Sequence, residues 1–372
     1  MDVYHKKGHI SSLDGVRGIA ILLVLFFHCF ENITFLSINY ISKIGWVGVD
    51  LFFVLSGFLI TGILIDSKGK KNFLSNFFAK RALRIFPLYY LTLFLFFLVL
   101  SIPGITRINP AFNTILYQSS TNYLTFTQNI YFAFNGWGDT DILNHFWSLA
   151  IEEQFYLFWP FIINYLDRKK IISACFLLII ISLTVRNYNA YSDFSYVFTL
   201  SRVDALGIGS MLAILIRDYR KILNKLILPI FFISISILLL ILFQTKNLHF
   251  RNPYFVRFGY TLFALLFASI IAFIYDTKKI GMFTNRILSV SPLRFFGKYS
   301  YGIYIYHWIL YKGVYVYLAN KYNLPDLFII PFLLAVILIS VISFKYFEKY
   351  FLNFKSKLNN TKPSELQLTE AD

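Results

Sequence analysis

Windows of about 17–22 apolar residues, long enough to cross a hydrocarbon core, recur along almost the whole chain. About ten such windows are predicted, with approximate bounds of 14–30, 46–65, 86–103, 146–166, 171–186, 196–216, 226–243, 257–275, 297–318 and 326–346. Of the 372 residues 57% are hydrophobic and 15% are charged, which is more apolar surface than a soluble domain can bury. The sequence therefore predicts an all-α, polytopic integral membrane protein.

Lysine and arginine are distributed unevenly over the loops between these windows. If Lys6 and Lys7 are cytoplasmic, alternate loops place about 25 cations on the cytoplasmic side and about eight, Arg186 among them, on the other. This asymmetry predicts cytoplasmic termini and assigns the net charge of +16 to topology and anionic lipid rather than to nucleic acid. We expect a membrane domain over 1–355, with an outward-facing segment near 104–145, and a disordered cytoplasmic tail over 356–372.

Arg17 and His28 lie eleven residues apart in the first window. Eleven residues make about three helical turns, so both side chains share one helix face and are separated by about 16 Å along the axis. Ionisable groups inside a bilayer are costly and usually functional, so the pair indicates a reaction centre within the membrane.

The second window, GWVGVDLFFVLSGFLITG, carries Asp50 near its outer end and Gly45, Gly48 and Gly57 along its length. Glycines allow two helices to approach closely, so packing is the favoured interpretation of these three. Asp50 needs a partner at that depth and is a candidate for the site.

Arg81 and Arg84 lie three residues apart, just before Pro87 and the predicted start of the third window. Two guanidinium groups on one side of a helix end are suited to binding phosphates. A cluster that sets topology and contacts lipid headgroups is the alternative, and the spacing alone does not separate the two.

The fourth window begins HFWSLAIEEQFYLFWPF, in which Ser148, Glu152 and Tyr156 follow one another at a spacing of four residues. Glu152 would lie at a depth similar to that of His28, where a carboxylate can stabilise an imidazolium. An ion pair of Glu152 with Arg202 is the structural alternative.

Three further ionisable residues lie inside predicted windows. Arg202 and Asp204 are two residues apart and do not face each other on a helix, so each is expected to pair with another span. His307 lies near mid-membrane, where a lone histidine is more often a buried structural residue than a catalytic one. His145 and His249 fall in loops and are weaker candidates. Cys29 and Cys175 lie in separate windows without ligand spacing, so neither a metal site nor a disulfide is predicted.

The motifs, taken in order, resemble the acyltransferase 3 family of bacterial membrane proteins. The segments that carry the resemblance are RGIAILLVLFFH, GWVGVDLFFVLSGFLIT, KRALRIFPLYY, FWSLAIEEQFYLFWP, SRVDAL and YSYGIYIYHW, spread from about residue 11 to about residue 350. The resemblance implies transfer of an acyl group, commonly acetyl, from cytoplasmic acyl-coenzyme A to a hydroxyl of a surface or exported carbohydrate such as O-antigen or exopolysaccharide.

The resemblance also implies a location, a set of roles and a list of partners. The protein would lie in the bacterial inner membrane, with acyl-coenzyme A as co-substrate, a carbohydrate acceptor, surrounding lipid and no bound cofactor. Arg17 and His28 would be the catalytic pair, Arg81 and Arg84 would contact the donor, and Glu152 would belong to the active site. The chain resembles the members that lack an appended extracytoplasmic hydrolase-like domain.

His28 is expected to act as general base on the acceptor hydroxyl, with Glu152 or Asp50 supporting the imidazolium. Ser148 or a tyrosine would donate hydrogen bonds to the oxyanion, and an acyl-histidine intermediate is the competing mechanism. A secondary transporter or lipid-linked glycan flippase is the alternative function, with the buried charges along its path, although the sequence contains no inverted repeat.

Overall fold

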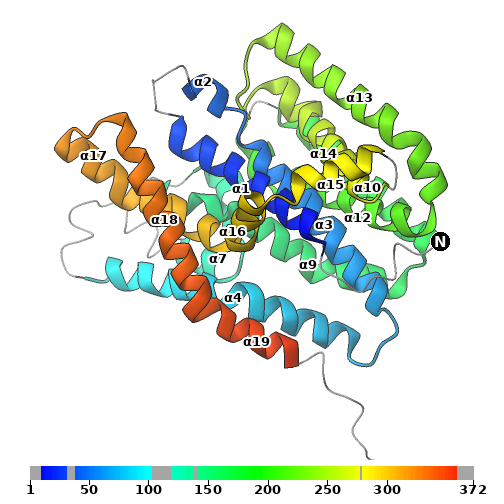
Figure 1. Cartoon of the computed structure of the whole chain (residues 1–372), viewed down its shortest axis with the longest axis horizontal. Helices are drawn as coiled ribbons and strands as arrows, with labels where there is room; N and C mark the ends of the chain where they lie inside the picture. The colour runs from blue at the N-terminus through cyan, green and yellow to red at the C-terminus, as the bar shows by residue number, and fades with distance from the viewer. Residues whose placement is uncertain are drawn as a thin grey trace, which may run out of the picture.

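The computed structural model describes residues 10–31, 38–102, 119–137, 141–190, 192–276 and 279–357, and every regular element within these ranges is helical (Figure 1). The predicted tail lies outside the described residues from 358 onward, as do Lys6, Lys7 and residues 103–118. The α-helices are α1 (Ser11–Phe30), α2 (Ile38–Ser42), α3 (Val47–Ser67), α4 (Phe73–Leu100), α7 (Ser120–Leu124), α8 (Gln128–Asn135), α9 (Trp147–Tyr165), α10 (Arg168–Tyr188), α11 (Phe194–Val197), α12 (Thr199–Asp218), α13 (Arg220–Thr245), α14 (Tyr260–Ile274), α15 (Lys279–Leu288), α16 (Ser291–Leu310), α17 (Val316–Tyr322), α18 (Ile329–Ser343) and α19 (Lys349–Lys357).

Short helical segments of other types extend several of these elements. The 3₁₀ segments are η3 (Asp141–Phe146) and η6 (Asp326–Phe328), and the π-helical segments are η4 (Phe255–Gly259), η5 (Tyr311–Tyr315) and η7 (Phe344–Glu348). Segment η3 leads directly into α9, and η5 continues α16.

Eight helical segments in the described part of the chain are long and apolar enough to cross a membrane. They account for eight of the ten predicted windows and confirm an all-α, multi-pass membrane protein. The other two windows, 146–166 and 297–318, coincide with α9 and α16, which are helices of 19 and 20 residues. These two helices are less apolar because they contain polar and ionisable side chains, including Glu152 and His307.

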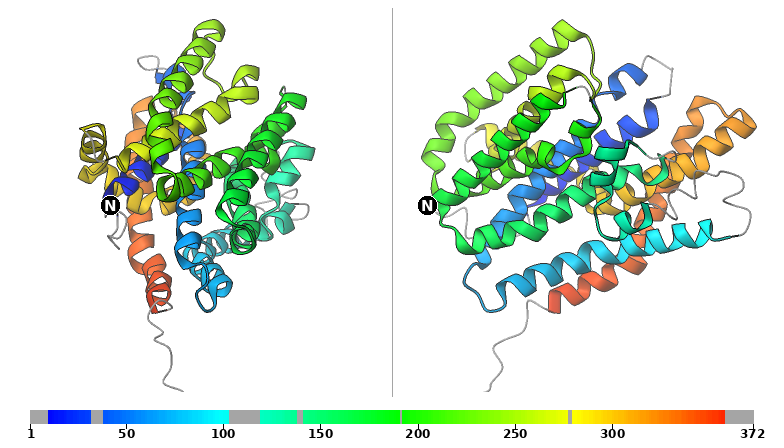
Figure 2. Two further views of the ribbon diagram at one scale, coloured as in Figure 1. Left: turned by 90° about the vertical axis from the view of Figure 1, so that its right-hand side faces the viewer. Right: turned by 180° about the vertical axis from the view of Figure 1, so that it is seen from behind.

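Helix α4 begins earlier than the sequence predicted. It runs from Phe73 through Pro87 to Leu100, so Arg81 and Arg84 lie inside it and not at its end. Proline removes one backbone donor and disfavours the helical conformation of the residue before it, which made Pro87 look like a boundary. Helix α4 runs alongside α19 (Figure 2).

The interior of the bundle is built around α3 and α12. In the hydrophobic windows of these two spans 78% of the residues are buried, against 17% for the windows of α13 and of the segment containing α18. Helices α13 and α18 instead expose apolar side chains such as Phe232, Leu239 and Leu334, as expected for helices that contact lipid.

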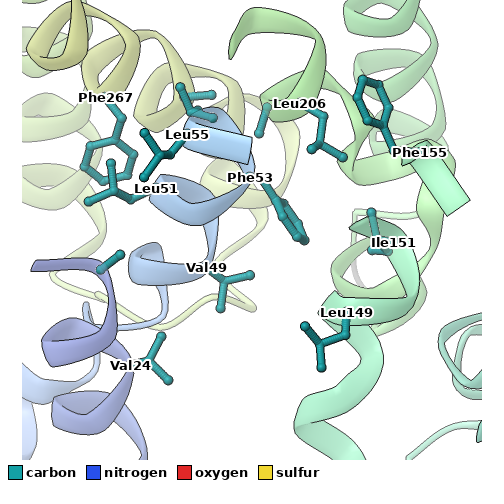
Figure 3. Close-up of a cluster of buried hydrophobic side chains, with 14 of the residues drawn as sticks. Val24, Val49, Leu51, Phe53, Leu55, Leu149, Ile151, Phe155, Leu206 and Phe267 are labelled. Atoms are coloured by element: carbon teal, nitrogen blue, oxygen red, sulfur yellow. The ribbon is translucent and has the colours of Figure 1, made fainter. Parts of the chain in front are cut away.

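Glycine allows α3 to pack closely against its neighbours. A Cβ atom on Gly57 would overlap the carbonyl oxygen of Leu206 in α12, and one on Gly48 would overlap that of Ala20 in α1. These contacts confirm the packing interpretation of the glycines. Side chains from α1, α3, α9, α12 and α14 meet in the apolar core beside these close helix contacts. Figure 3 labels Val24, Phe53, Ile151, Leu206 and Phe267 among others.

Candidate active site

His28 lies in the last turn of α1 and is hydrogen-bonded to a second histidine, His307 of α16. The distance from His28 Nδ1 to His307 Nε2 is 2.8 Å. The other ring nitrogen of His307, Nδ1, is 2.8 Å from the carbonyl oxygen of Tyr304 and 3.1 Å from that of Ile303. His307 is completely buried. Backbone carbonyls contact one ring nitrogen and His28 contacts the other, so the ring is held from both sides.

These contacts determine which nitrogen of each ring carries a proton. A carbonyl oxygen only accepts hydrogen bonds, so Nδ1 of His307 is the donor and Nε2 of the neutral ring is an acceptor. His28 must then donate from Nδ1, which leaves the lone pair on its Nε2 available. A neutral imidazole with one nitrogen anchored and the other available is the form that a general base requires.

His28 lines a cavity of about 240 Å³, which we call the histidine cavity. Its lining includes His28, Glu31, Trp46, Trp137, Asn144, His145 and Trp308. Lys312 lines it as well and is paired with Asp141 at 3.1 Å. A cavity with aromatic walls and mixed polar groups suits a polar ligand that also has flat apolar faces.

His145 contributes a third imidazole to this cavity, although the sequence made it a weaker candidate. Its Nε2 is 3.3 Å from the carbonyl oxygen of Ile305, whereas its Nδ1 is buried and has no hydrogen-bond partner among the described residues. The Oδ1 atom of Asn144, the preceding residue, is also buried without a partner in the part of the chain that the structure describes, while its Nδ2 donates to Asp141. Burial beside His307 and His28 holds the pKa of His145 well below its usual range, so this ring is neutral at physiological pH.

The position of His145 in segment η3 explains why the sequence places this residue in a loop. The segment is a short 3₁₀ segment immediately before α9, so it reads in the sequence as a loop. The available signal was its position at the mouth of the fourth window, directly before the FWSL motif.

Three of the four arginines singled out from the sequence line a second cavity of about 110 Å³, which we call the arginine cavity. Arg17 of α1 and Arg81 and Arg84 of α4 all face it, with Ser56, Glu152 and Tyr156. Arg17 is paired with Asp14 at 2.9 Å, and the guanidinium of Arg81 lies 4.9 Å from the centre of the Tyr156 ring. Within the described residues no carboxylate forms an ion pair with Arg81 or Arg84, so this cavity favours an anionic ligand.

Glu152 belongs to the arginine cavity, and the expectation that it supports His28 is wrong. Its Oε1 accepts a hydrogen bond of 2.5 Å from the hydroxyl of Ser56 in α3. Counting residues along each span predicted a similar depth for Glu152 and His28, but the two side chains line different cavities. The group that supports His28 is His307.

Asp50 is paired with Arg202 and lines neither cavity. Their closest oxygen and nitrogen are 2.8 Å apart, and the guanidinium lies 4.1 Å from the centre of the Tyr260 ring. Neither the proposed support of His28 by Asp50 nor an ion pair between Glu152 and Arg202 matches this arrangement.

Asp204 is paired with Arg186 of α10 at 2.9 Å, and both side chains are buried. Both Arg202 and Asp204 therefore pair with another span, as predicted. The placement of Arg186 in an outer loop was wrong, because α10 continues to Tyr188 and brings its guanidinium into the bundle.

Ser148 and Tyr304 connect the two cavities. Ser148 lines the arginine cavity, and Tyr304 lines both cavities, as does Val49. The Tyr304 hydroxyl donates to the carbonyl oxygen of His145 at 2.5 Å and is 2.6 Å from the hydroxyl of Ser148, which must then be the donor in that bond.

The site therefore consists of one cavity lined by guanidinium groups and one cavity that contains a base, with Tyr304 and Val49 at the boundary between them. Guanidinium groups without carboxylate partners can hold phosphates, and the Nε2 atom of His28 can take a proton from a hydroxyl. Among the described residues no group of three histidine, cysteine or acidic side chains is arranged to hold a metal ion.

Comparison with known proteins gives a consistent family match. The family model described as an acyltransferase domain matches residues 10–345. YrhL of Bacillus subtilis (strain 168), whose name gives peptidoglycan O-acetylation as its proposed activity, is 32% identical over 82% of this chain and 50% of its own length. The O-acetyltransferase OatA of Staphylococcus aureus (strain NCTC 8325) is 30% identical over 94% of this chain and 58% of its own length. The chain thus spans about half the length of the curated relatives it matches. No solved structure matches it.

Proposed function

The chain belongs to the acyltransferase 3 family, and we propose that it is an O-acetyltransferase that moves an acetyl group from cytoplasmic acyl-coenzyme A to a hydroxyl of an exported carbohydrate. The observation that carries the proposal is the junction of the two cavities. A base of defined tautomer lies in one cavity, and three guanidinium groups line the other.

The arginine cavity fits the polyanionic end of acyl-coenzyme A. Arg81 and Arg84 would contact its phosphates, because a guanidinium group forms two parallel hydrogen bonds to one phosphate. Arg17 is partly neutralised by Asp14 and would guide the flexible arm toward His28. The carboxylate of Glu152, held by Ser56, would orient Arg17 and Arg81 within the same cavity.

Transfer would take place at His28. The Nε2 atom removes the proton from the acceptor hydroxyl while its oxygen attacks the thioester carbonyl. The tetrahedral intermediate collapses, the carbon–sulfur bond breaks, and the departing thiolate takes the proton from His28, which returns the base to its neutral form. The Ser148 hydroxyl donates its single proton to Tyr304 in this structure, and it would have to exchange that bond for one to the oxyanion during transfer.

An acyl-histidine route uses the same atoms in a different order. Nε2 of His28 would first displace the thiolate, and the acceptor hydroxyl would then attack the acyl-imidazole. Acid-quenched protein mixed with acetyl-coenzyme A in the absence of acceptor distinguishes the two routes. Mass added to the peptide that contains His28 indicates the acyl-enzyme, and its absence during turnover indicates direct transfer.

The acceptor is proposed to be a carbohydrate of the cell surface. The histidine cavity offers aromatic faces such as Trp137 and Trp308 together with polar groups, a combination that suits a sugar ring. Peptidoglycan is the first class to test because the name of YrhL refers to it. O-antigen and exopolysaccharide are the other classes.

The proposed location is the bacterial inner membrane, with both termini cytoplasmic. The excess of lysine and arginine in alternate loops supports this orientation. It would open the arginine cavity toward the cytoplasmic donor and the histidine cavity toward the acceptor.

The test compares cells that carry no gene, the wild-type gene or the His28→Ala variant at matched membrane expression. Mass spectrometry of the glycan fractions should find added O-acetyl groups with the wild type alone. Membranes with wild-type protein should also release thiol from acetyl-coenzyme A. Absence of both thiol release and glycan acetylation would refute the proposal.

A further inference from the structure

We propose that Tyr304 is a gate between the arginine cavity and the histidine cavity, and that it must move aside before the acyl group of the donor can reach His28. The role of the gate in acyl transfer rests on the proposed function. The position of Tyr304 between the two cavities is argued from geometry alone. The structure describes its closed position.

The first observation is that Tyr304 lies on the boundary between the two cavities. Val49 of α3 and Tyr304 of α16 line both of them. Tyr304 is only 7% exposed, so its side chain is enclosed by its neighbours. Valine has a small, stiff side chain, whereas a tyrosine ring can swing about two dihedral angles and so open or close a passage.

The second observation is that the Tyr304 hydroxyl is fastened from both sides of the boundary. It donates to the carbonyl oxygen of His145, which lines the histidine cavity, and accepts from the hydroxyl of Ser148, which lines the arginine cavity. Both bonds join neutral groups, so they are modest in net strength and can be exchanged for contacts with an entering ligand.

The third observation is the separation of the two ends of the site. Arg17 and His28 are about 16 Å apart along α1 by helix geometry. A donor whose phosphates lie against Arg81 and Arg84 would have to extend its arm from the arginine cavity into the histidine cavity, and Tyr304 and Val49 are the residues that line both.

A closed gate would protect the donor from water. If the cavities were continuous, water in the histidine cavity could replace the acceptor hydroxyl. Its oxygen would bond to the acyl carbon, the carbon–sulfur bond would break, and the thiol would leave with a proton from His28. Free carboxylic acid would then form in place of acetylated glycan.

Cysteine labelling tests the gate without requiring any acyl transfer. In a background with Cys29→Ala and Cys175→Ala, a Ser56→Cys substitution places a thiol in the arginine cavity. A charged, membrane-impermeant methanethiosulfonate is added to sealed vesicles from the side on which Glu31→Cys is labelled, because Glu31 lines the histidine cavity.

Removal of the gate should make the cysteine at position 56 accessible from that side. Tyr304→Phe should raise the labelling rate by about tenfold, the population change expected when one or two neutral hydrogen bonds are lost, and Tyr304→Ala should raise it further. Tyr306→Phe is the matched control, because this tyrosine of α16 bonds to Ser343 and lines neither cavity. Equal labelling rates in the wild-type, Tyr304→Phe and Tyr304→Ala backgrounds would overturn the gate.

Enzymatic coupling gives the second readout. The amount of thiol released per acetyl group transferred should rise severalfold in Tyr304→Phe, and thiol release should persist without acceptor. An unchanged ratio in Tyr304→Phe would contradict the protective role. If the wild type neither releases thiol nor acetylates glycan, the proposed function fails, whereas the labelling experiment still decides whether Tyr304 separates the cavities.

Discussion

His28 and His307 share a hydrogen bond of 2.8 Å although 279 positions separate them in the sequence. The bond joins the last turn of α1 to α16, and backbone carbonyls of Tyr304 and Ile303 hold the far side of the His307 ring. In the proposed reaction His307 would therefore act through His28, as a positioning residue that holds the His28 ring by its Nδ1 atom.

We predict that His307→Leu lowers the acetyl-transfer kcat by about 10²–10³-fold, because it leaves Nδ1 of His28 without an acceptor and the ring without a defined tautomer. His307→Gln can still accept through its side-chain oxygen and should recover part of that loss. Steady-state kinetics on both variants, with thermal melting as the check on folding, measure the effect. Equal losses in both variants would show that only the packing of His307 matters, and His249→Leu in the loop should change nothing.

Arg84→Ala is predicted to raise the KM for acetyl-coenzyme A by about 10–100-fold, the loss of one charge-assisted contact, with a smaller change in kcat. The increase should be largest at low salt, because the lost interaction is between charges. Lys80→Ala is the matched control, since Lys80 belongs to the same basic cluster but does not line the arginine cavity. If Lys80→Ala and Arg84→Ala behaved alike, the cluster would serve topology rather than donor binding.

The sequence predicted the helices and singled out several residues that line the two cavities, because both depend on local patterns. The spacing of Arg17 and His28 placed them on one helix, and the apolar windows coincide with helices throughout the described residues. Arg81 and Arg84, three residues apart, likewise lie on one helix, although α4 begins before both of them.

The partners of these residues could not be predicted, because they depend on how the helices are rotated against one another. Counting along two spans gives the depth of Glu152 and of His28 but not the direction in which each side chain points. The same limit explains why the contact of His307 with His28 could not be predicted from a lone histidine on an apolar helix. Arg186 was misplaced for a different reason, since a charged residue at the edge of an apolar window reads as loop.

The buried pair of Asp50 and Arg202 should contribute to stability rather than to turnover. Asp50→Ala is predicted to cost about 3–5 kcal/mol, because it leaves a buried guanidinium unpaired. The double substitution Asp50→Leu with Arg202→Met should cost less than the single one, since it removes both charges. Thermal unfolding in detergent measures this, with the exposed Lys170→Ala as control. A double variant less stable than Asp50→Ala would contradict the prediction.

Gly57→Ala is predicted to destabilise the bundle by about 1–3 kcal/mol, the usual cost of overpacking. The added methyl group would overlap the backbone of Leu206, so α3 and α12 would have to separate. Gly313→Ala is the matched control, because nothing lies within 4 Å of a Cβ atom at that position. Thermal melting of both variants should show a loss for Gly57→Ala alone, and equal stability of the two would mean that α3 and α12 adjust without cost.

Asn144 provides a prediction for the acceptor side of the reaction. Its Oδ1 and the Nδ1 of His145 are buried in the wall of the histidine cavity, and neither has a hydrogen-bond partner within the described ranges. Because Asn144 Nδ2 already donates to Asp141 and His145 Nε2 faces the carbonyl oxygen of Ile305, both remaining atoms are acceptors. They suit a ligand that donates hydrogen bonds, as the hydroxyl and amide groups of a sugar do.

Asn144→Leu should therefore raise the KM for the carbohydrate acceptor by about threefold to tenfold, the loss of one neutral hydrogen bond, and leave the KM for acetyl-coenzyme A unchanged. The measurement varies each substrate in turn at saturating levels of the other. Asn187→Leu on the exposed face of α10 is the control for substituting an asparagine as such. An equal rise in both KM values would mean that Asn144 maintains the shape of the whole site, whereas a rise confined to the acceptor would assign the unpaired oxygen to acceptor binding.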